Sequence, residues 1–385
     1  MSDIKVDSEK KVLILGEYSA FSRNLKAGLK QYKCKVTVYT TGDSFKQIEH
    51  DADDLYIKTK DLNINNFRLR GTWRVRGFFN NLKVRKYKKQ NKAGLDLILI
   101  LNPDFIGAGT IFRGAFSLDD CRGLLKRNGK LFLSACGVDI AYLKYGGRMR
   151  YWPFSDYDSD EVMALSGKLD VGLFMNLISS VHGIIPVMYD YAFAYRELAK
   201  ETPVRLFRTI PLPVDTGSVS YLPNIAGERI IIFHGKSLYD SKGSSIIIQA
   251  MNSLKTRYPG KVELLLPDRL PFAEYLKAIG QANIIVDQCR SYSYAMNTLY
   301  ALSMGKVVFS GNEPECSEEF GVEVPVINIL PDAKDIEQKL ERFILDPSLL
   351  ESVGISGRKF AEKFHDSRVI ASKYLSLLSD NTDCK

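Results

Sequence analysis

The stretch NIIVDQCRSYSYAMNTLYALSMGKVVFS, residues 283–310, decides the fold of this chain. It begins with an apolar run that is typical of a strand buried on both faces. Ser291 and Ser293 follow where a helix N-cap is expected, and from Tyr294 onward apolar residues recur at helical spacing. Gly305 ends this helix, and a second apolar run begins another strand. The stretch therefore predicts a strand–helix–strand unit with a polar joint, and ligands bind at such joints in open parallel sheets.

Length and composition indicate a globular protein of two domains. The chain has 385 residues, of which 45% are hydrophobic and 25% are charged, and this length suits two domains of ordinary size. No apolar run approaches the ~20 residues needed to span a bilayer, and the polar residues 1–11 predict no export signal. The six cysteines are scattered without a CxxC pair, so we expect reduced thiols in the cytoplasm and neither disulfides nor structural zinc.

The net charge of +8 is concentrated in one segment, residues 66–92, which contains ten basic residues and no acid. Trp73, Phe78 and Phe79 are interleaved with these cations. A basic segment with aromatic residues favours an anionic membrane surface, here the inner face of the membrane. The alternative is a solvated basic loop and helix face. We expect no nucleic acid partner, because no nucleic-acid-binding module accompanies the segment.

The first half of the chain predicts a β-α-β beginning followed by further strands. A nicotinamide site would need GxGxxG after the first strand, but the loop GEYSAFS contains one glycine, Gly16, so Gly16 and Glu17 are expected only to line a cleft. Residues 146–161, which are rich in glycine, aromatic residues and acids, are predicted to form a long surface loop. His182 lies at a second joint, and a structural, hydrogen-bonded histidine is the alternative to a functional one. Strands are predicted at 11–16, 36–39, 96–101 and 130–134, and helices at 22–31, 118–126 and 189–198.

The second half is a regular series of strands and helices that follows a proline-rich connection at 205–227. After its first strand come Gly235-Lys236 and Lys242-Gly243, which resemble an anion cradle because glycines admit a phosphate to the backbone and lysines neutralise it. The alternative is a pair of solvated lysines. Strands are predicted at 229–233, 262–266, 284–286, 307–309 and 326–329, and helices at 245–258, 272–279, 332–345, 347–353, 357–364 and 367–378.

These residues together resemble the GT-B glycosyltransferases, and family 4 most closely. That family carries a G-[RK]…K-G pair, matched by Gly235-Lys236 and Lys242-Gly243, and a small-x-Gly-Lys-x-Val helix end, matched by ALSMGKVV at 301–308. The sequence of residues 291–315 is similar to that of bacterial capsular and surface-polysaccharide glycosyltransferases. The resemblance covers 208–378 and implies an α/β fold of two Rossmann-like parallel-sheet domains that face a central cleft. The implied domains are an acceptor-side domain at 1–210, a nucleotide-sugar-binding domain at 211–365 and a terminal helix at 366–385 that packs back on the first domain.

One departure from the family concerns its two glutamates, which have seven residues between them. The corresponding positions here are Tyr292 and Tyr300. In the family the first glutamate contacts the donor sugar and the second contacts the ribose, and a tyrosine hydroxyl can hydrogen-bond a ribose only without charge assistance. Either the donor is held differently, through Glu313 and Glu315, or activity has been lost.

The resemblance implies a retaining, hexosyltransferase-like enzyme that needs no metal or other cofactor. Its donor would be a nucleotide diphosphate sugar, and its acceptor a glycan or lipid-linked molecule of surface polysaccharide synthesis. The implied catalytic residues are His182, Lys236 and Lys242, and the implied donor-binding residues are Gly16, Glu17, Gly235, Gly243, Asp287, Tyr294, Asn297, Tyr300, Glu313 and Glu315. The alternatives are a non-catalytic sugar-nucleotide or glycan-binding protein on the same scaffold and a sugar-nucleotide epimerase. We expect a cytoplasmic protein, peripheral on the membrane.

Overall fold

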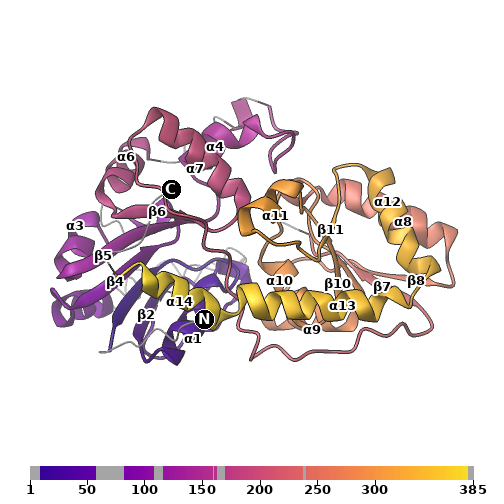
Figure 1. Cartoon of the computed structure of the whole chain (residues 1–385), viewed down its shortest axis with the longest axis horizontal. Helices are drawn as coiled ribbons and strands as arrows, with labels where there is room; N and C mark the ends of the chain where they lie inside the picture. The colour runs from indigo at the N-terminus through magenta and orange to yellow at the C-terminus, as the bar shows by residue number, and fades with distance from the viewer. Residues whose placement is uncertain are drawn as a thin grey trace, which may run out of the picture.

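Two parallel β-sheets lie side by side in the computed structural model, each with helices packed against it (Figure 1). The structure describes residues 9–57, 82–107, 116–158, 160–162, 170–236 and 240–379. Most of the predicted membrane-binding segment, residues 66–81, lies outside the described residues. Within the described residues, no helix is both long and apolar enough to cross a membrane.

The first sheet has six parallel strands in the order β3-β2-β1-β4-β5-β6. Its central strands are buried on both faces, as continuous apolar runs such as residues 12–15 require. The strands are β1 (Lys11–Leu15), β2 (Lys35–Thr40), β3 (Leu55–Tyr56), β4 (Leu95–Ile100), β5 (Leu125–Ala135) and β6 (Gly183–Pro186). Among them lie the α-helices α1 (Phe21–Gln31), α3 (Leu118–Leu124), α4 (Ile140–Tyr145), α6 (Val171–Ser180) and α7 (Tyr189–Glu201).

The second sheet has five parallel strands in the order β11-β10-β9-β7-β8. The predicted series of alternating strands and helices is confirmed. The strands are β7 (Ile230–Phe233), β8 (Val262–Leu265), β9 (Ile284–Val286), β10 (Val307–Ser310) and β11 (Ile327–Asn328). The helices are α8 (Ser244–Arg257), α9 (Phe272–Gln281), α10 (Met296–Ser303), α11 (Pro314–Phe320), α12 (Ala333–Leu345), α13 (Leu349–Phe360), which continues as a π-helical turn over Ala361–His365, and α14 (Ser367–Ser376).

The predicted serine N-cap of α10 is wrong. The N-cap residue is Ala295, which makes no side-chain cap. Ser293 instead belongs to a contact between the domains: its N–H donates to Oδ2 of Asp190 at 2.8 Å, and its hydroxyl accepts from the Asp190 N–H at 3.4 Å. Ser293 therefore makes a tertiary contact with Asp190 and does not cap the helix that follows it.

The prediction of a surface loop at residues 146–161 is also wrong. Tyr151, Trp152 and Phe154 are buried, because the segment packs against the first domain and reaches the second. Arg150 donates to Oε2 of Glu313 at 2.5 Å, and the Tyr151 hydroxyl donates to the other carboxylate oxygen. The aromatic side chains of the segment belong to the hydrophobic core of the first domain.

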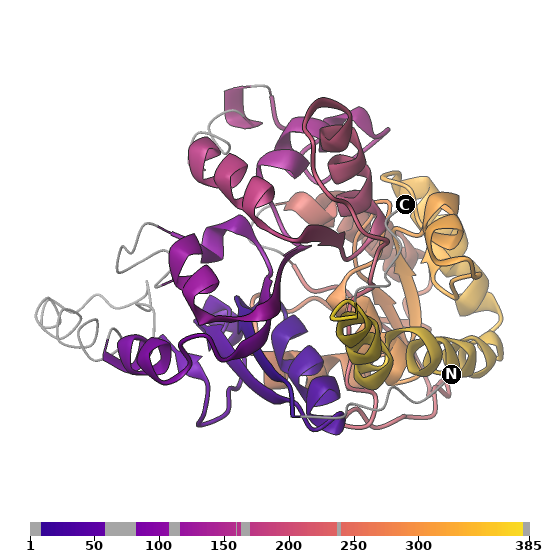
Figure 2. The same cartoon turned by 60° about the vertical axis from the view of Figure 1, so that its left-hand side comes forward.

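The C-terminal helix crosses back to the first domain, as predicted. Figures 1 and 2 both place α14 beside α1. The crossing begins where Val214 of the connection pairs with the chain around Asp366, with N–H···O distances of 2.8 Å in both directions. The Tyr374 hydroxyl then lies 2.6 Å from Oγ of Ser134 at the end of β5. The chain thus links its two domains twice.

Close packing of α1 on α14 depends on Gly28. A Cβ atom at this position would lie 1.9 Å from the carbonyl oxygen of Ser367. We expect Gly28→Ala to lower the free energy of unfolding by about 1–3 kcal/mol, because the helices must separate to admit the methyl group. Denaturant unfolding followed by circular dichroism measures this effect.

Gly123 is the matched control for Gly28. It lies in α3, where a Cβ atom would meet nothing within 4 Å, so Gly123→Ala should be neutral or stabilise by up to ~1 kcal/mol through helix propensity. Equal effects of the two substitutions would contradict the proposed role of the α1–α14 contact.

Candidate functional site

A cavity of about 380 Å³ lies between the two domains. Its walls come from loops that follow β1 and β2 in the first domain and β7, β8 and β9 in the second. This is the carboxyl edge of both sheets, where open α/β proteins bind ligands. The lining residues are Ser19, Phe45, Lys46, Gly235, Lys236, Ser241, Lys242, Asp268, Arg269, Leu270, Phe272, Tyr275, Ala295, Met296 and Asn297.

The loop after β7 is anchored by a buried histidine, His234. Its Nδ1 lies 2.8 Å from the carbonyl oxygen of Val286, which can only accept, so Nδ1 carries the proton and Nε2 accepts from the Ser244 hydroxyl at 2.8 Å. Burial, assisted by the charge of Lys242, lowers the pKa of His234 to about 4. The neutral ring therefore ties β7, β9 and α8 together, and it fixes the loop that carries Gly235 and Lys236.

Lys242 and Asp287 form a buried ion pair at the cavity wall. Nζ of Lys242 lies 2.7 Å from Oδ1 of Asp287 and 3.3 Å from the carbonyl oxygen of Gly235. Asn297 and Thr298 of α10 donate to the two carboxylate oxygens at 3.3 and 3.2 Å. Burial alone would raise the pKa of Asp287, but Lys242 and Asn297 outweigh burial and lower it. The predicted residues Lys242, Asp287 and Asn297 are thus brought together.

Two glycines shape this part of the site. A Cβ atom at Gly235 would lie 2.7 Å from the Tyr275 ring, and one at Gly243 would lie 2.4 Å from Sγ of Cys289. Gly243 also has a φ of +76°, which favours glycine, and it is the N-cap residue of α8. Both predicted glycines therefore have a structural cause, and Gly235 lines the cavity.

Of the two predicted lysines, Lys236 is the more exposed: its side chain is 42% exposed, against 15% for Lys242. Its Nζ lies 3.6 Å from a carboxylate oxygen of Asp268, which is also exposed. Sequence analysis missed the first domain's cation, Lys46. Its Nζ donates to Oγ of Ser19 and to Oδ2 of Asp43, each at 2.7 Å, and it lines the same cavity as Lys236. No motif marks Lys46, because only the fold brings it to the second domain.

Gly16 and Glu17 lie at the carboxyl end of β1, as predicted, but neither lines this cavity. Glu17 caps α1, since its two carboxylate oxygens accept from the N–H groups of Ser22 and Arg23 at 3.2 and 3.0 Å. Burial raises the pKa of Glu17 to about 8. Gly16 has a φ of +116°, and a Cβ atom there would lie 2.3 Å from the Phe105 ring.

Two predicted site residues are corrected. His182 precedes β6 and accepts the Leu131 N–H at 3.0 Å through Nδ1. This places His182 at the amino edge of the sheet, opposite the edge that faces the cavity, so it does not face a donor sugar. Tyr294 is buried, its hydroxyl lies 2.8 Å from Nε2 of His365 in the core, and it does not line the cavity.

Tyr292 and Tyr300, the positions expected to correspond to the paired glutamates, link the domains. The buried Tyr300 hydroxyl accepts from Nδ2 of Asn24 on α1 at 2.7 Å, which contradicts the predicted role of Tyr300 at a ribose. The Tyr292 hydroxyl accepts from the N–H and Nε of Arg150, each at 3.2 Å. Both hydroxyls are used inside the protein.

Glu313 and Glu315, the suggested substitutes for the glutamate pair, lie at the start of α11 and do not line the cavity. Glu313 is buried and bound by Arg150, Tyr151 and Asn328. Oε2 of Glu315 is buried and has no hydrogen-bond partner within the described residues. Glu313 is thus a structural carboxylate.

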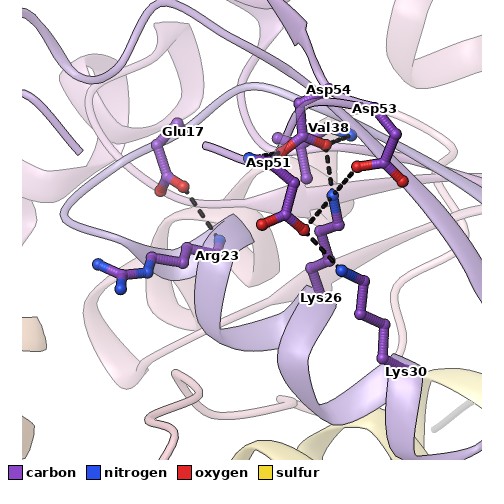
Figure 3. Close-up of polar contacts among 8 residues, drawn as sticks. All are labelled: Glu17, Arg23, Lys26, Lys30, Val38, Asp51, Asp53 and Asp54. Carbon is purple, nitrogen blue, oxygen red and sulfur yellow. Dashed lines mark hydrogen bonds and ion pairs between the residues drawn. The ribbon is translucent and has the colours of Figure 1, made fainter. Parts of the chain in front are cut away.

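Within the described residues, one group of acidic side chains has a spacing that could hold a metal ion: Asp51, Asp53 and Asp54. Figure 3 shows that the ammonium group of Lys26 points into this group, and its distances to the three carboxylates are 2.8, 2.9 and 2.7 Å. Lys30 also contacts Asp51, at 2.6 Å. The space between the carboxylates is therefore occupied by an internal cation, and Lys26 and Lys30 together offset most of their charge.

We expect Lys26→Met to lower the free energy of unfolding by about 3 kcal/mol, because it leaves several carboxylates together without a buried countercharge. Lys26 is 5% exposed, whereas Lys30 is 50% exposed, so the control Lys30→Met should cost less than about 1 kcal/mol. Lys26 and Lys30 lower the pKa of Asp51 to about 2. The contribution of the Asp51 carboxylate to the free energy of unfolding is therefore present above its ordinary pKa and lost as the pH falls toward 2.

Denaturant titrations of both variants at pH 7 and pH 3 test this prediction. A smaller loss for Lys26→Met than for Lys30→Met would contradict it.

Comparisons with known proteins place the fold. No protein-family model matches this chain, and no curated protein sequence matches it. Among solved structures, sucrose-phosphate synthase from Thermosynechococcus elongatus is similar over 96% of this chain and 98% of its own, with 14% identity and a TM-score of 0.59. A glycosyltransferase from Rickettsia africae covers 96% and 98%, with 12% identity and a TM-score of 0.53.

A third similar structure is HepE from Anabaena in complex with UDP-glucose. It covers 96% of this chain and 99% of its own, with 14% identity and a TM-score of 0.57. These likenesses extend over both domains. Together with the two facing parallel sheets, they establish that the chain has the GT-B fold.

Proposed function

We propose that this protein is a glycosyltransferase that moves a sugar from a nucleotide diphosphate sugar to an acceptor. The observation that carries the proposal is the cavity between the domains, which is lined by Lys46, Lys236 and Lys242 and by the start of α10. Cations and free helix N–H groups are the partners that a diphosphate requires. A similar structure, that of Anabaena HepE, contains UDP-glucose, which supports this class of donor.

The chemistry needs stabilisation of the leaving group. When the bond between the anomeric carbon and the diphosphate oxygen breaks, the nucleoside diphosphate gains negative charge, and preorganised cations lower that barrier. Lys236 is free to approach a phosphate. Lys242 is held by Asp287, so its charge is fixed in place before the donor binds. Asn297 completes this wall of the cavity.

We further propose that the reaction is hexosyltransferase-like, that it retains anomeric configuration and needs no metal, and that its acceptor is a glycan or lipid-linked molecule of surface polysaccharide synthesis. These features rest on the resemblance of the Gly235-Lys236…Lys242-Gly243 and 301–308 motifs to family 4 enzymes. Incubation with a panel of nucleotide sugars and lipid-linked acceptors, followed by mass spectrometry and proton NMR of the product, tests them. A panel that gives neither transfer nor donor hydrolysis would favour the non-catalytic alternative.

Lys236 gives the cleaner test of the diphosphate site. Lys236→Met should weaken UDP or GDP binding by about 1.5–3 kcal/mol, the usual contribution of a hydrogen bond to a charged group, or roughly ten- to a hundredfold in affinity. Isothermal calorimetry measures it. The control is Lys277→Met, on the exposed surface of α9, which should leave affinity unchanged. Equal affinities for the Lys236 variant and the wild type would refute the role of Lys236.

Lys242 requires a paired substitution. Lys242→Met alone leaves the buried Asp287 without its cation and should cost about 3–5 kcal/mol of stability. The double variant Lys242→Met/Asp287→Asn removes both charges and should recover most of that loss. If the folded double variant binds UDP or GDP as tightly as the wild type, the fixed charge of Lys242 does not serve the donor. Thermal unfolding and calorimetry together separate the two effects.

We also propose that the protein is cytoplasmic and binds the inner face of the membrane through residues 66–92. The basic charge of this segment supports the proposal. Sedimentation with anionic phosphatidylglycerol vesicles should recover the protein at low salt and release it at ~0.5 M salt, because the attraction is screened. Equal binding to neutral phosphatidylcholine vesicles would rule out an electrostatic contact.

A further inference from the structure

An aromatic ring of the first domain, Phe45, stands exposed at the cavity between the domains. Its side chain is 42% exposed, and it lines the cavity, although phenylalanine is usually buried. The flanking residues Asp43, Ser44 and Gln47 have φ values of 52°, 59° and 50°. Such conformations are costly for residues other than glycine, and they cluster at ligand clamps. The chain therefore accepts local strain where it presents this ring.

The loop that carries Phe45 is fixed on both sides. Oδ2 of Asp43 accepts from the Ser19 N–H and from Nζ of Lys46, each at 2.7 Å. The Ile48 N–H donates to the carbonyl oxygen of Gly42 at 2.8 Å. These bonds place the ring on a defined support, and they join it to the two first-domain groups, Ser19 and Lys46, that line the same cavity.

A second-domain cation faces this ring. The guanidinium carbon of Arg269 lies 5.8 Å from the centroid of Phe45. Arg269 is followed by Leu270 and Phe272, which also line the cavity. Lys242 and Asn297 meet elsewhere, at Asp287, whereas Lys236 lies 3.6 Å from Asp268 and Lys46 directly follows Phe45 in the chain. The ring and the guanidinium are thus distinct from the polar group around Asp287.

We propose that Phe45 and Arg269 bind the base of the nucleotide by stacking, so that the first domain supplies a nucleobase contact to the donor. Purine and pyrimidine rings stack on aromatic faces and on guanidinium planes whatever their hydrogen-bonding edges. The phenyl ring is uncharged and offers a phosphate no partner, whereas Arg269 can pair with a phosphate as well as stack on a base, so Phe45 is the residue that distinguishes the two. This inference rests on the proposed function, and it adds the orientation of the donor: diphosphate at Lys236 and Lys242, base at Phe45.

Calorimetry of the full chain with UDP, GDP and inorganic pyrophosphate tests the proposal. Phe45→Ala should weaken nucleoside diphosphate binding roughly five- to a hundredfold, the range for loss of one stacked aromatic, and leave pyrophosphate affinity unchanged. Phe45→Tyr keeps the ring and should stay within about twofold of the wild type. The matched control is Ile225→Ala, which removes a more exposed apolar side chain (68%) beside Asn283, at the amino edge of the second sheet.

A second readout uses Phe45→Trp. UDP or GDP should quench the emission of the introduced indole, measured against the wild type to subtract Trp73 and Trp152, whereas pyrophosphate should leave it unchanged. This readout keeps a large ring in place and does not depend on the folding of the alanine variant.

The outcomes separate the two proposals. A wild type that binds neither UDP nor GDP overturns the proposed function, and the base-stacking role with it. A wild type that binds either nucleotide, with affinity unaffected by Phe45→Ala, or weakened equally for pyrophosphate, overturns the role of Phe45 and leaves the function standing. Nucleotide-specific weakening with nucleotide-specific quenching supports both.

Discussion

The buried ion pair of Lys242 and Asp287 is the interaction on which the candidate site depends. A carboxylate inside a protein is costly unless a cation and hydrogen-bond donors accompany it. Here the Asp287 carboxylate accepts from the ammonium of Lys242, in the loop before α8. It also accepts from Asn297 and Thr298 in the first turn of α10. The pair therefore sets the distance between the two loops that enclose the cavity. His234 supports the same arrangement with a neutral ring.

The orientation of the domains depends on a second set of polar contacts. Tyr300 reaches α1 through Asn24, Tyr292 accepts from Arg150, and Glu313 receives Arg150 and Tyr151. A glutamate at position 300 would bring a buried negative charge to this junction, whereas a tyrosine hydroxyl needs one neutral partner. Tyr292 and Tyr300 thus hold the domains together.

The cavity belongs to neither domain alone. Ser19, Phe45 and Lys46 belong to the first domain, and the remaining lining residues belong to the second. The return of α14 to α1 and the close approach at Gly28 hold these walls in register. One hydrophobic core also runs through the junction, from β1 and α1 to α10 and α14. A ligand in this position would contact both domains at once.

The sequence by itself determined most strands, most helices and the parallel architecture, although it did not predict β3 and β6. Apolar runs such as IIV at 284–286 and helical spacing such as that from Tyr294 to Leu302 are local signals, and burial follows them directly. The glycine–lysine pairs were visible for the same reason, since each motif spans few residues.

Only the tertiary structure decided the partners of these residues. Asn24 meets Tyr300 across 276 positions of the chain, and Lys46 reaches the cavity of Lys236 without any motif. Ser293 was expected to cap a helix, but it binds Asp190 instead. His182 was expected at a joint, but the residues that follow it form strand β6, so it lies at the amino edge of the sheet. Hydrogen bonds and ion pairs between distant segments depend on distances that a sequence pattern does not contain, whereas the periodicity of buried residues is written along the chain.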